Sequence, residues 1–343
     1  MEVRPQEQRL IQFAAELPAG RILCNTLGRA QLALALAKAH AQSQVACFSL
    51  DLYQVQQSQL AGTPLPGNLR FVCDSDPPPD EIDLAAWCFS KQGDAELTRD
   101  LLQASHQHLA IGGRMAAAID NPADQWLHEQ LRGMFDKVTR RPEPGTTLYL
   151  ATKTRPLKKI KDFTSEFAFR DAGRPIDLRT RPGVFSHREV DGGARALIKA
   201  MDIQPGLRVL DLGSGSGAVG IAAALRAEGV RVQATDSNPR AIEAVRWGAE
   251  RNGVSTLTAA LDCDGSSLDP GTFDLVLANP PYFSNFSLAG LFATIAHRAL
   301  APRGTLLVVT KTPDWYRAAL AKRFDPIATR EAGSYQIVQA TRL

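Results

Sequence analysis

An order of segments that occurs twice constrains this chain more than any other feature of its sequence. An apolar strand leads into a glycine-containing turn, a helix follows, and a second strand ends in an acidic residue. The segments are 20–28, 29–41 and 44–51 in the first half, and 207–213, 218–229 and 230–236 in the second. Strands separated by helices predict a parallel, doubly wound sheet. We interpret the repeated order as an internal duplication of one α/β domain, with chance repetition as the alternative.

Further elements extend the pattern in both halves. In the first half we expect strands over 68–73, 81–90 and 111–120 and a helix over 94–109. In the second half, Asn238 as N-cap, Pro239 at the first helical position and Gly253 after the last turn predict a helix over 238–253. Strands over 273–282 and 305–310 and a helix over 288–304 complete that half. With 343 residues, the chain is long enough for two domains.

A basic segment separates the two halves. Between Lys153 and Arg181 nine basic residues stand against four acidic ones, whereas the whole chain carries a net charge of only +3. We therefore expect a linker over 151–181 between domains at 1–150 and 182–343. Such a segment could follow a phosphate backbone, because each neutralised phosphate releases counterions. A solvated linker face without a partner is the other interpretation.

The sequence also argues against several classes of protein and site. No apolar run is long enough to span a membrane, and the N-terminus lacks the apolar core of a secretory signal, so we expect a cytoplasmic protein. The five cysteines are scattered and form no CxxC pair, which argues against a disulfide framework and a zinc site. His106 and His108 lack the spacing of a metal pair, so we expect no metal.

Three alternating glycines, Gly213, Gly215 and Gly217, lie between a predicted strand and a predicted helix. Their missing side chains let a ligand approach the backbone, and the start of the helix offers free N–H groups. Asp236 ends the next strand, where a carboxylate can bind both hydroxyls of a ribose. The turn therefore indicates a nucleotide-like cofactor. GSGAVG at 215–220 also fits a nicotinamide dinucleotide, and a tight turn without a ligand is a third interpretation.

Asp262 follows the apolar residues LTAAL and could end a third strand at the same edge. There it could meet an adenine amino group together with the backbone N–H of Cys263. It could equally be an acid of a surface loop. The sequence alone leaves both interpretations open.

The segment Asn279-Pro280-Pro281-Tyr282 ends the strand predicted over 273–282. A planar exocyclic amine is a poor nucleophile because its lone pair is delocalised. The Asn279 side-chain oxygen and the Pro280 carbonyl can each accept one of its N–H groups, which holds the nitrogen in near-attack geometry and stabilises the positive charge that develops. Two prolines stiffen the turn, and Tyr282 offers a face for stacking a base. A plain turn after a buried strand is the alternative.

Asp211 precedes the glycines and completes the string DLGSGSG. Together with NPPY, this string resembles class I S-adenosylmethionine-dependent methyltransferases. Nearly the whole chain, including PGVFSHREVDGGARAL at 182–197, is similar to the two-domain ribosomal RNA guanine-N2 methyltransferases of the small-subunit methyltransferase C and large-subunit methyltransferase G families. The resemblance implies an α/β fold of two tandem Rossmann-like methyltransferase domains with doubly wound, mostly parallel sheets. The N-terminal copy is degenerate, because CNTLG stands where DLGSGSG stands later and WCFSK where NPPYF does.

The resemblance also implies a cofactor, a substrate and the residues that bind them. S-adenosylmethionine would be held by Asp211, Gly213, Gly215, Gly217, Asp236 and Asp262, with the backbone of Cys263 beside them. Phe185, Ser186, Asp191 and Pro281 would line the substrate cleft, and Asn279, Pro280 and Tyr282 would carry the catalysis. The reaction would be methylation of the N2 amine of a guanine in ribosomal RNA, with naked RNA or a ribosomal subunit as the partner. The first copy, residues 1–150, is expected to assist RNA docking and to bind no S-adenosylmethionine.

Other functions stay open on the sequence alone. NPPY also occurs in protein-glutamine and adenine-N6 methyltransferases, so the target amine could be either of these. A nicotinamide-dependent oxidoreductase that uses GSGAVG is more remote, and the intact NPPY opposes a non-catalytic RNA-binding factor. Trp247 and Trp315 are expected to be packing residues rather than platforms for bases.

Overall fold

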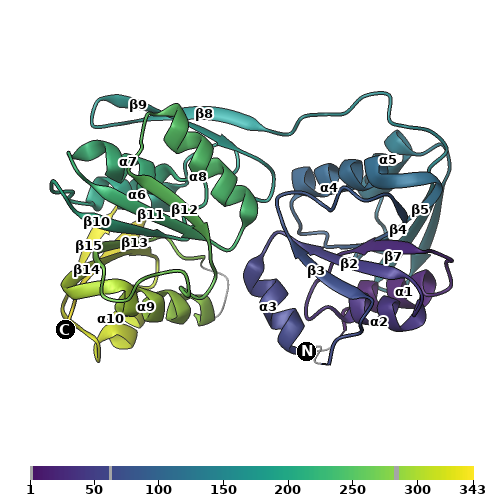
Figure 1. Cartoon of the computed structure of the whole chain (residues 1–343), viewed down its shortest axis with the longest axis horizontal. Helices are drawn as coiled ribbons and strands as arrows, with labels where there is room; N and C mark the ends of the chain where they lie inside the picture. The colour runs from purple at the N-terminus through teal and green to yellow at the C-terminus, as the bar shows by residue number, and fades with distance from the viewer. Residues whose placement is uncertain (1–2, 62–63, 282–285) are drawn as a thin grey trace. The chain divides into compact units, whose positions relative to one another are not determined.

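The structure, a computed structural model, describes residues 3–61, 64–281 and 286–343. The chain divides into two compact units, Met1–Phe163 and Thr164–Leu343, and each contains one large sheet with helices on both faces (Figure 1). Among the helices of the described segments, none is both long and apolar enough to cross a membrane.

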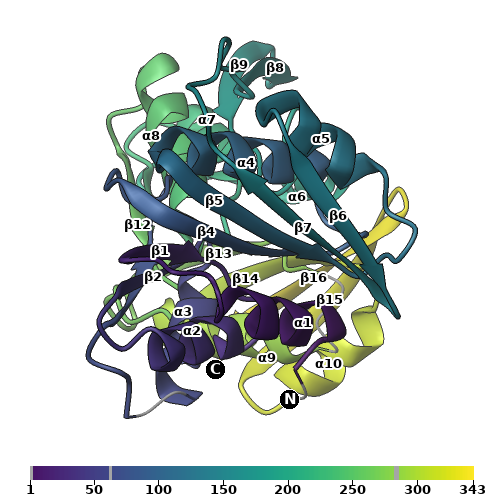
Figure 2. The same cartoon turned by 90° about the vertical axis from the view of Figure 1, so that its right-hand side faces the viewer.

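The first unit is built on a seven-stranded sheet with the order β3-β2-β1-β4-β5-β7-β6. Neighbouring strands from β3 to β5 are parallel, whereas β7 is antiparallel to both β5 and β6 (Figure 2). The elements are α1 (Pro5–Ala14), β1 (Arg21–Cys24), α2 (Gln31–Ala39), β2 (Gln44–Ser49), α3 (Leu52–Ala61), β3 (Leu69–Cys73), β4 (Ile82–Phe89), α4 (Ala95–His108), β5 (Leu109–Ile119), α5 (Trp126–Met134), β6 (Val138–Glu143) and β7 (Thr146–Thr152).

The second unit repeats this arrangement strand for strand. Its sheet has the order β12-β11-β10-β13-β14-β16-β15, and β16 is antiparallel to both of its neighbours, β14 and β15, whereas the pairs from β12 to β14 are parallel. The elements are β8 (Ser165–Asp171), β9 (Arg174–Thr180), α6 (Gly192–Ala200), β10 (Arg208–Leu212), α7 (Ala218–Arg226), β11 (Arg231–Asp236), α8 (Pro239–Arg251), β12 (Leu257–Leu261), β13 (Phe273–Ala278), α9 (Ser287–Ala299), β14 (Leu300–Thr310), α10 (Pro313–Leu320), β15 (Phe324–Ala332) and β16 (Tyr335–Arg342). The shared topology confirms the predicted α/β class with doubly wound, mostly parallel sheets.

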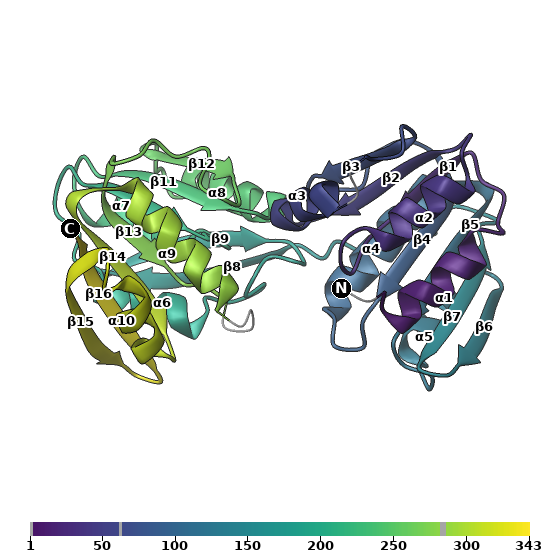
Figure 3. The same ribbon diagram turned by 90° about the horizontal axis from the view of Figure 1, so that it is seen from below.

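Side-chain alternation along the central strands divides each core in two. In β10, Val209 packs with residues of α6, α7 and α8, while Leu210 packs with residues of α9 and α10. Figure 3 shows α9 and α10 together on one face of the sheet. In β1, Ile22 and Leu23 make the same division between α1 and α2 on one face and α4 and α5 on the other. Burial on both faces explains why these strands read as continuous apolar runs in the sequence.

The predicted boundary between the helix over 288–304 and the strand over 305–310 differs in the structure, and the physical cause of the difference is present in both units. The helix predicted to reach 304 ends at Ala299, and β14 begins at Leu300 with an irregular register against β13. Gly304 allows this bend, because a Cβ there would lie 2.9 Å from the carbonyl oxygen of Phe273. Gly113 lies at the equivalent place in β5, and the burial patterns of the two strands are identical.

The prediction that 151–181 is a linker was wrong for residues 165–180. Strands β8 and β9 pair there as an antiparallel hairpin, and Phe169, Ile176 and Leu178 are buried in the core of the second unit. Arg226 of α7 holds the hairpin through a double hydrogen-bonded ion pair with Asp171, at 2.8 Å for each bond. The second unit therefore begins at Thr164 rather than at 182. The basic residues of the hairpin lie on its exposed side because apolar residues alternate with them.

Candidate functional site

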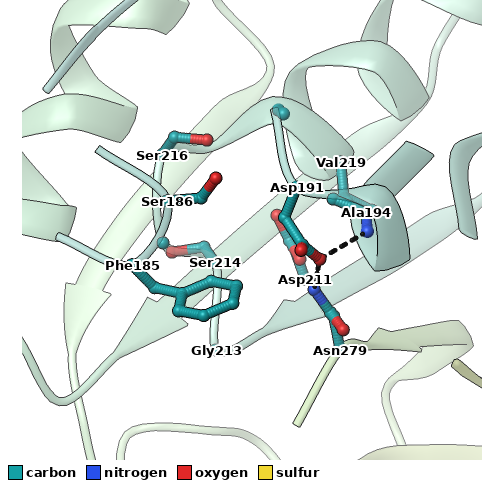
Figure 4. A pocket seen from close by; sticks show the side chains of 12 residues that line it. Phe185, Ser186, Asp191, Ala194, Asp211, Gly213, Ser214, Ser216, Val219 and Asn279 are labelled. Atoms are coloured by element: carbon teal, nitrogen blue, oxygen red, sulfur yellow. Dashed lines mark hydrogen bonds between the residues drawn. The ribbon is translucent and has the colours of Figure 1, made fainter. Parts of the chain in front are cut away.

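Most residues predicted to bind a ligand meet at the carboxyl edge of the second sheet. β10, β11 and β13 are adjacent parallel strands, so the loops that follow them emerge at the same edge. A pocket opens there (Figure 4). The predicted site residues that line it are Phe185, Ser186, Asp191, Asp211, Gly213, Gly215 and Asn279.

The glycine turn holds its shape through backbone hydrogen bonds and close packing. The N–H groups of Gly213 and Ser214 both donate to the Thr235 carbonyl at 2.9 Å. Gly217 has a φ of +82° directly before α7, and a Cβ there would lie 3.1 Å from Cγ2 and 3.2 Å from Cα of Val245. Only glycine combines this φ with such a close approach. The turn therefore brings bare backbone to the wall of the pocket.

Replacing Gly217 by alanine is expected to lower the free energy of unfolding by about 2–4 kcal/mol, because left-handed backbone strain adds to an overlap with Val245. Gly253→Ala is a matched control. Gly253 also has a positive φ, +68°, but nothing lies within 4 Å of a Cβ there. The control should lose only the strain of about 1–2 kcal/mol. Urea unfolding compares the two variants, and equal losses would show that the packing against Val245 is unimportant.

Asp236 links the glycine turn to the start of α8. Its Oδ2 accepts the N–H of Gly215 at 2.8 Å, and its Oδ1 accepts the N–H of Asn238 at 2.9 Å. Asn238 is the N-cap of α8, as predicted, and its side chain accepts the N–H of Arg240 at 2.9 Å. Two loops therefore fix the orientation of the carboxylate that was predicted to bind a ribose.

Asp262 follows β12 as predicted, but its carboxylate faces its own loop. It is 7% exposed and accepts hydrogen bonds from the N–H groups of Asp264, Gly265 and Ser267 and from the Ser267 hydroxyl. Burial raises the pKa of Asp262, but these hydrogen bonds outweigh burial and hold the pKa below its ordinary value. Asp262 is therefore an acid of a loop, but its carboxylate is buried within that loop rather than exposed to solvent. Asp262 shapes the loop that carries Cys263, and the predicted adenine contact stays a proposal.

Asp211 carries a carboxyl group that lines the pocket and is only 3% exposed. Its Oδ2 accepts the N–H of Gly220 at 2.8 Å. Burial raises the pKa of Asp211 to about 7 despite this hydrogen bond, and the charge of Asp236 adds to the shift. A cation in the pocket would therefore interact favourably with the ionised form of Asp211.

Two features of the pocket fit the cofactor that the sequence implies. S-adenosylmethionine carries cationic sulfonium and ammonium groups, which suit the buried carboxyl group of Asp211. The Ser214 hydroxyl at the pocket is buried and has no hydrogen-bond partner among the described residues, so a polar ligand could supply one. Within the same described segments, no cluster of three or more His, Cys, Asp or Glu side chains could hold a metal ion.

Asn279, at the end of β13, is held by Asp191, the N-cap of α6 (Figure 4). The Asp191 Oδ2 accepts hydrogen bonds from the backbone N–H groups of Gly193 at 2.8 Å and Ala194 at 3.2 Å. It also accepts a hydrogen bond from the Asn279 Nδ2 at 2.9 Å. A carboxylate only accepts hydrogen bonds, so the amide nitrogen of Asn279 must face Asp191 and the amide oxygen must point elsewhere. Sequence reasoning placed Asp191 in the cleft but missed this contact, since its place before a helix signals only an N-cap.

The segment that precedes α6 is fastened to α8. The Asn238 Nδ2 donates to the Gly183 carbonyl at 2.7 Å, and Nη1 of the buried Arg240 donates to the Pro182 carbonyl at 2.7 Å. These bonds place Phe185, which is 55% exposed, at the pocket. Sequence reasoning missed Arg240, because a charged residue in the first turn of a helix gives no local sign of burial.

The other residues of the NPPY segment follow Asn279 at the carboxyl edge of the second sheet. Pro280 is buried and Pro281 half-buried directly after β13. Tyr282 lies outside the residues that the structure describes. Its stacking against a base therefore stays a prediction.

The equivalent turn of the first unit, between β1 and α2, is filled by side chains of the chain itself. The Thr26 hydroxyl accepts the N–H groups of Gly28 at 3.1 Å and Ala30 at 2.9 Å. The buried carboxyl group of Glu7, on α1, accepts the N–H of Leu32 at 3.2 Å. Backbone groups that could bind a ligand are thus used internally here, which supports the interpretation of a degenerate copy.

Comparison with known proteins finds a family model that matches most of the second unit. Residues 175–339 match the family described as methyltransferase small domain. Ribosomal RNA small subunit methyltransferase C of Pseudomonas putida (strain F1) is 28% identical over 201 residues, 57% of this chain and 59% of that protein. Ribosomal RNA large subunit methyltransferase G of Streptomyces coelicolor is 29% identical over 277 residues, 76% of this chain and 71% of that protein. The match to the Pseudomonas protein spans less than two thirds of its length.

A solved structure shares the fold of both units. It is the 16S rRNA N2 methyltransferase of T. thermophilus, in complex with AdoMet and guanosine. The TM-score is 0.83 at 21% sequence identity, and the match covers 99% of this chain and 92% of that chain. At this identity the likeness establishes the fold, and it agrees with the resemblance drawn from the motifs.

Proposed function

We propose that this chain, whose second unit matches the methyltransferase small domain and whose motifs and fold resemble the ribosomal RNA guanine-N2 methyltransferases, transfers a methyl group from S-adenosylmethionine to the N2 amine of a guanine in ribosomal RNA. The observation that carries the proposal is the Asn279 amide, which Asp191 orients at a pocket bounded by the glycine turn. The names of the relatives support the class of substrate.

S-adenosylmethionine supplies an electrophilic methyl group when it is bound. In this chain the carboxyl group of Asp211, the glycine turn and the carboxylate of Asp236 would hold it. Asp211 would balance its positive charge, and Asp236 would bind the ribose hydroxyls. The loop that Asp262 shapes would present the Cys263 backbone to the adenine.

The NPPY segment would act on the target amine. The Asn279 Oδ1 and the Pro280 carbonyl accept the two N–H groups of the guanine N2, which draws its lone pair out of conjugation and aims it at the methyl group. The same acceptors stabilise the positive charge that develops on the nitrogen. A strong general base is unnecessary, because the nitrogen becomes acidic once it is methylated and loses its proton to water.

The first unit and the basic stretch after β7 would contact the RNA. Lys158, Lys159 and Lys161 are exposed there and could neutralise phosphates. A ribosomal subunit would be the partner when the substrate RNA is already assembled. We place the activity in the cytoplasm, where that RNA is made.

Transfer of a labelled methyl group tests the proposal. The acceptors are ribosomal RNA, ribosomal subunits and ribosomal protein from cells that lack this gene. We expect label in RNA that digests to N2-methylguanosine, and no label with Asn279→Ala. Label in N6-methyladenosine or in protein glutamine would mean that the site serves another amine. A shift in melting temperature with a nicotinamide cofactor but not with S-adenosylmethionine would favour an oxidoreductase instead.

A further inference from the structure

A stacked pair of aromatic rings lies at the start of α9 and α10. The Phe286 ring, at the N-cap of α9, stacks on Trp315 of α10 with centroids 4.9 Å and planes 13° apart. Trp315 meets the buried Tyr316 edge-on at 4.9 Å and packs against the core, whereas Phe286 is 44% exposed. The pair is therefore anchored through Trp315 and exposed through Phe286.

Topology brings this pair to the same edge of the sheet as Asn279. β13 and β14 are parallel neighbours, Asn279 follows β13, and α10 follows β14. Tyr335 begins β16, the antiparallel neighbour of β14, at that edge too. Its ring lies 3.2 Å from the place of a Cβ on Gly192, next to Asp191, and the Lys311 Nζ lies 5.2 Å from the ring centroid. Aromatic and basic side chains thus lie at the same edge of the sheet as the oriented amide.

Exposure and charge at this edge are more than packing requires. Among the described phenylalanines, Phe185 and Phe286 are the exposed ones, and Phe185 lines the pocket. Two exposed basic residues, Lys311 and Arg317, lie on the loop and helix that follow β14 at this edge, whereas Lys322 and Arg323 precede β15 at the opposite edge. Aromatic faces among basic side chains suit single-stranded nucleic acid, whose bases stack while its phosphates are neutralised. The chemistry of this surface therefore matches an RNA strand better than an apolar or an acidic protein surface.

We propose that Phe286 and Trp315 form a stacking site for a base of single-stranded RNA that adjoins the target guanine, with Lys311 and Arg317 facing its phosphates. This inference rests on the proposed function, because it names the RNA conformation that the same site accepts. A base splayed out from its neighbours can extend the stack on Phe286, whereas a base inside a duplex is already stacked. The site would therefore select an unpaired segment, as an enzyme must that needs its target amine outside a base pair.

Binding of a fluorescent oligoribonucleotide, single-stranded around a guanine, tests the site on the full chain. We expect Phe286→Ala to weaken binding about 10–100-fold, the usual effect of losing one stacked base. Phe286→Tyr keeps the ring and should bind like the wild type. Trp315→Phe keeps an anchoring ring in case removal of Trp315 disturbs the core. Leu343→Ala, which removes an apolar side chain that is 69% exposed in the second unit, at the other end of β16 from Tyr335, is the matched control. S-adenosylmethionine binding should be unchanged throughout.

The RNA side of the contact provides an independent check. Oligonucleotides that lack one base at a time on either side of the guanine should reveal one position whose loss weakens wild-type binding as much as Phe286→Ala does. The two losses should not add, because they remove the same contact. Equal binding by wild type and Phe286→Ala, with methyl transfer to RNA retained, would overturn the stacking site and leave the proposed function standing. Methyl transfer to protein alone would overturn both.

Discussion

Asn279→Ala is expected to lower the turnover of methyl transfer about 10²–10³-fold, the usual cost of losing one preorganised hydrogen-bonding group at a reacting centre. The affinity for S-adenosylmethionine should change little, because its proposed contacts are Asp211, Asp236 and the glycine turn. Steady-state kinetics with ribosomal RNA and calorimetric binding of the cofactor separate these effects. A parallel loss of cofactor binding would mean that Asn279 maintains the shape of the pocket rather than orienting the target amine.

Two further variants separate the orientation of the amide from its presence. Asn279→Asp puts a second carboxylate where the Asn279 Nδ2 now lies 2.9 Å from the Asp191 Oδ2, so the like charges repel or one group takes up a proton. Asp191→Asn replaces a carboxylate, which only accepts hydrogen bonds, with an amide that can also donate one. The Asn279 amide group can then flip its oxygen and nitrogen. Both should lose turnover, Asp191→Asn less than Asn279→Ala. Wild-type turnover in Asp191→Asn would contradict the orienting role.

The contribution of Asp211 to the stability of the ligand-free protein should fall as the pH rises, and Asp211→Asn should remove it. The pKa of Asp211 is about 7 in the folded protein, against an ordinary value of 3.8. Below about pH 4 both states hold the proton, so its stabilising contribution is fully present. Between these pKa values the unfolded chain releases its proton first, and the free energy of unfolding falls by about 1.4 kcal/mol per pH unit. The total loss above pH 7 is on the order of 4 kcal/mol.

Cofactor binding should show the opposite trend with pH. A cationic ligand favours the ionised Asp211, so binding releases a proton and the wild-type affinity rises as the pH passes through the pKa of about 7. Asp211→Asn should resist urea better than the wild type above that pH, yet bind the cofactor about tenfold or more weakly, a loss of at least one pKa unit of interaction. Calorimetry in buffers of different ionisation enthalpy measures the released proton. A variant with the wild-type pH profile would contradict the assignment to Asp211.

The elements that could be predicted from the sequence are those whose ends are marked by local residues, such as a capping side chain, a proline or a glycine. The helix from Pro239 was expected from its N-cap, its proline and the glycine after it, and it ends within two residues of the expected position. The hairpin β8–β9 was missed because half-exposed strands that carry many charges give the same signal as a solvated linker. The start of β14 was missed because Leu300 continues the helical pattern and joins the sheet only through a bulge that Gly304 permits.

The candidate site likewise contains residues that the local sequence could locate and contacts that it could not. The glycine turn and Asn279 could be located because strand ends and turns set their positions. The hydrogen bond between Asp191 and Asn279 joins residues 88 positions apart, and no local pattern encodes such a meeting. Trp315 was expected to pack, and it does pack against the core, but its stacking on Phe286 depends on the starts of two helices, α9 and α10, that meet only in the folded unit.

The side chains that fill the turn of the first unit also make its loss of a ligand site hard to undo. Reopening the turn would require Thr26 and Glu7 to release their backbone partners together. Either replacement alone leaves a buried N–H without an acceptor, at a cost of about 1–3 kcal/mol, before any ligand can compensate. Opening a ligand site there would therefore take concerted changes on two elements, whereas in the second unit the Ser214 hydroxyl is already without a hydrogen-bond partner among the described residues.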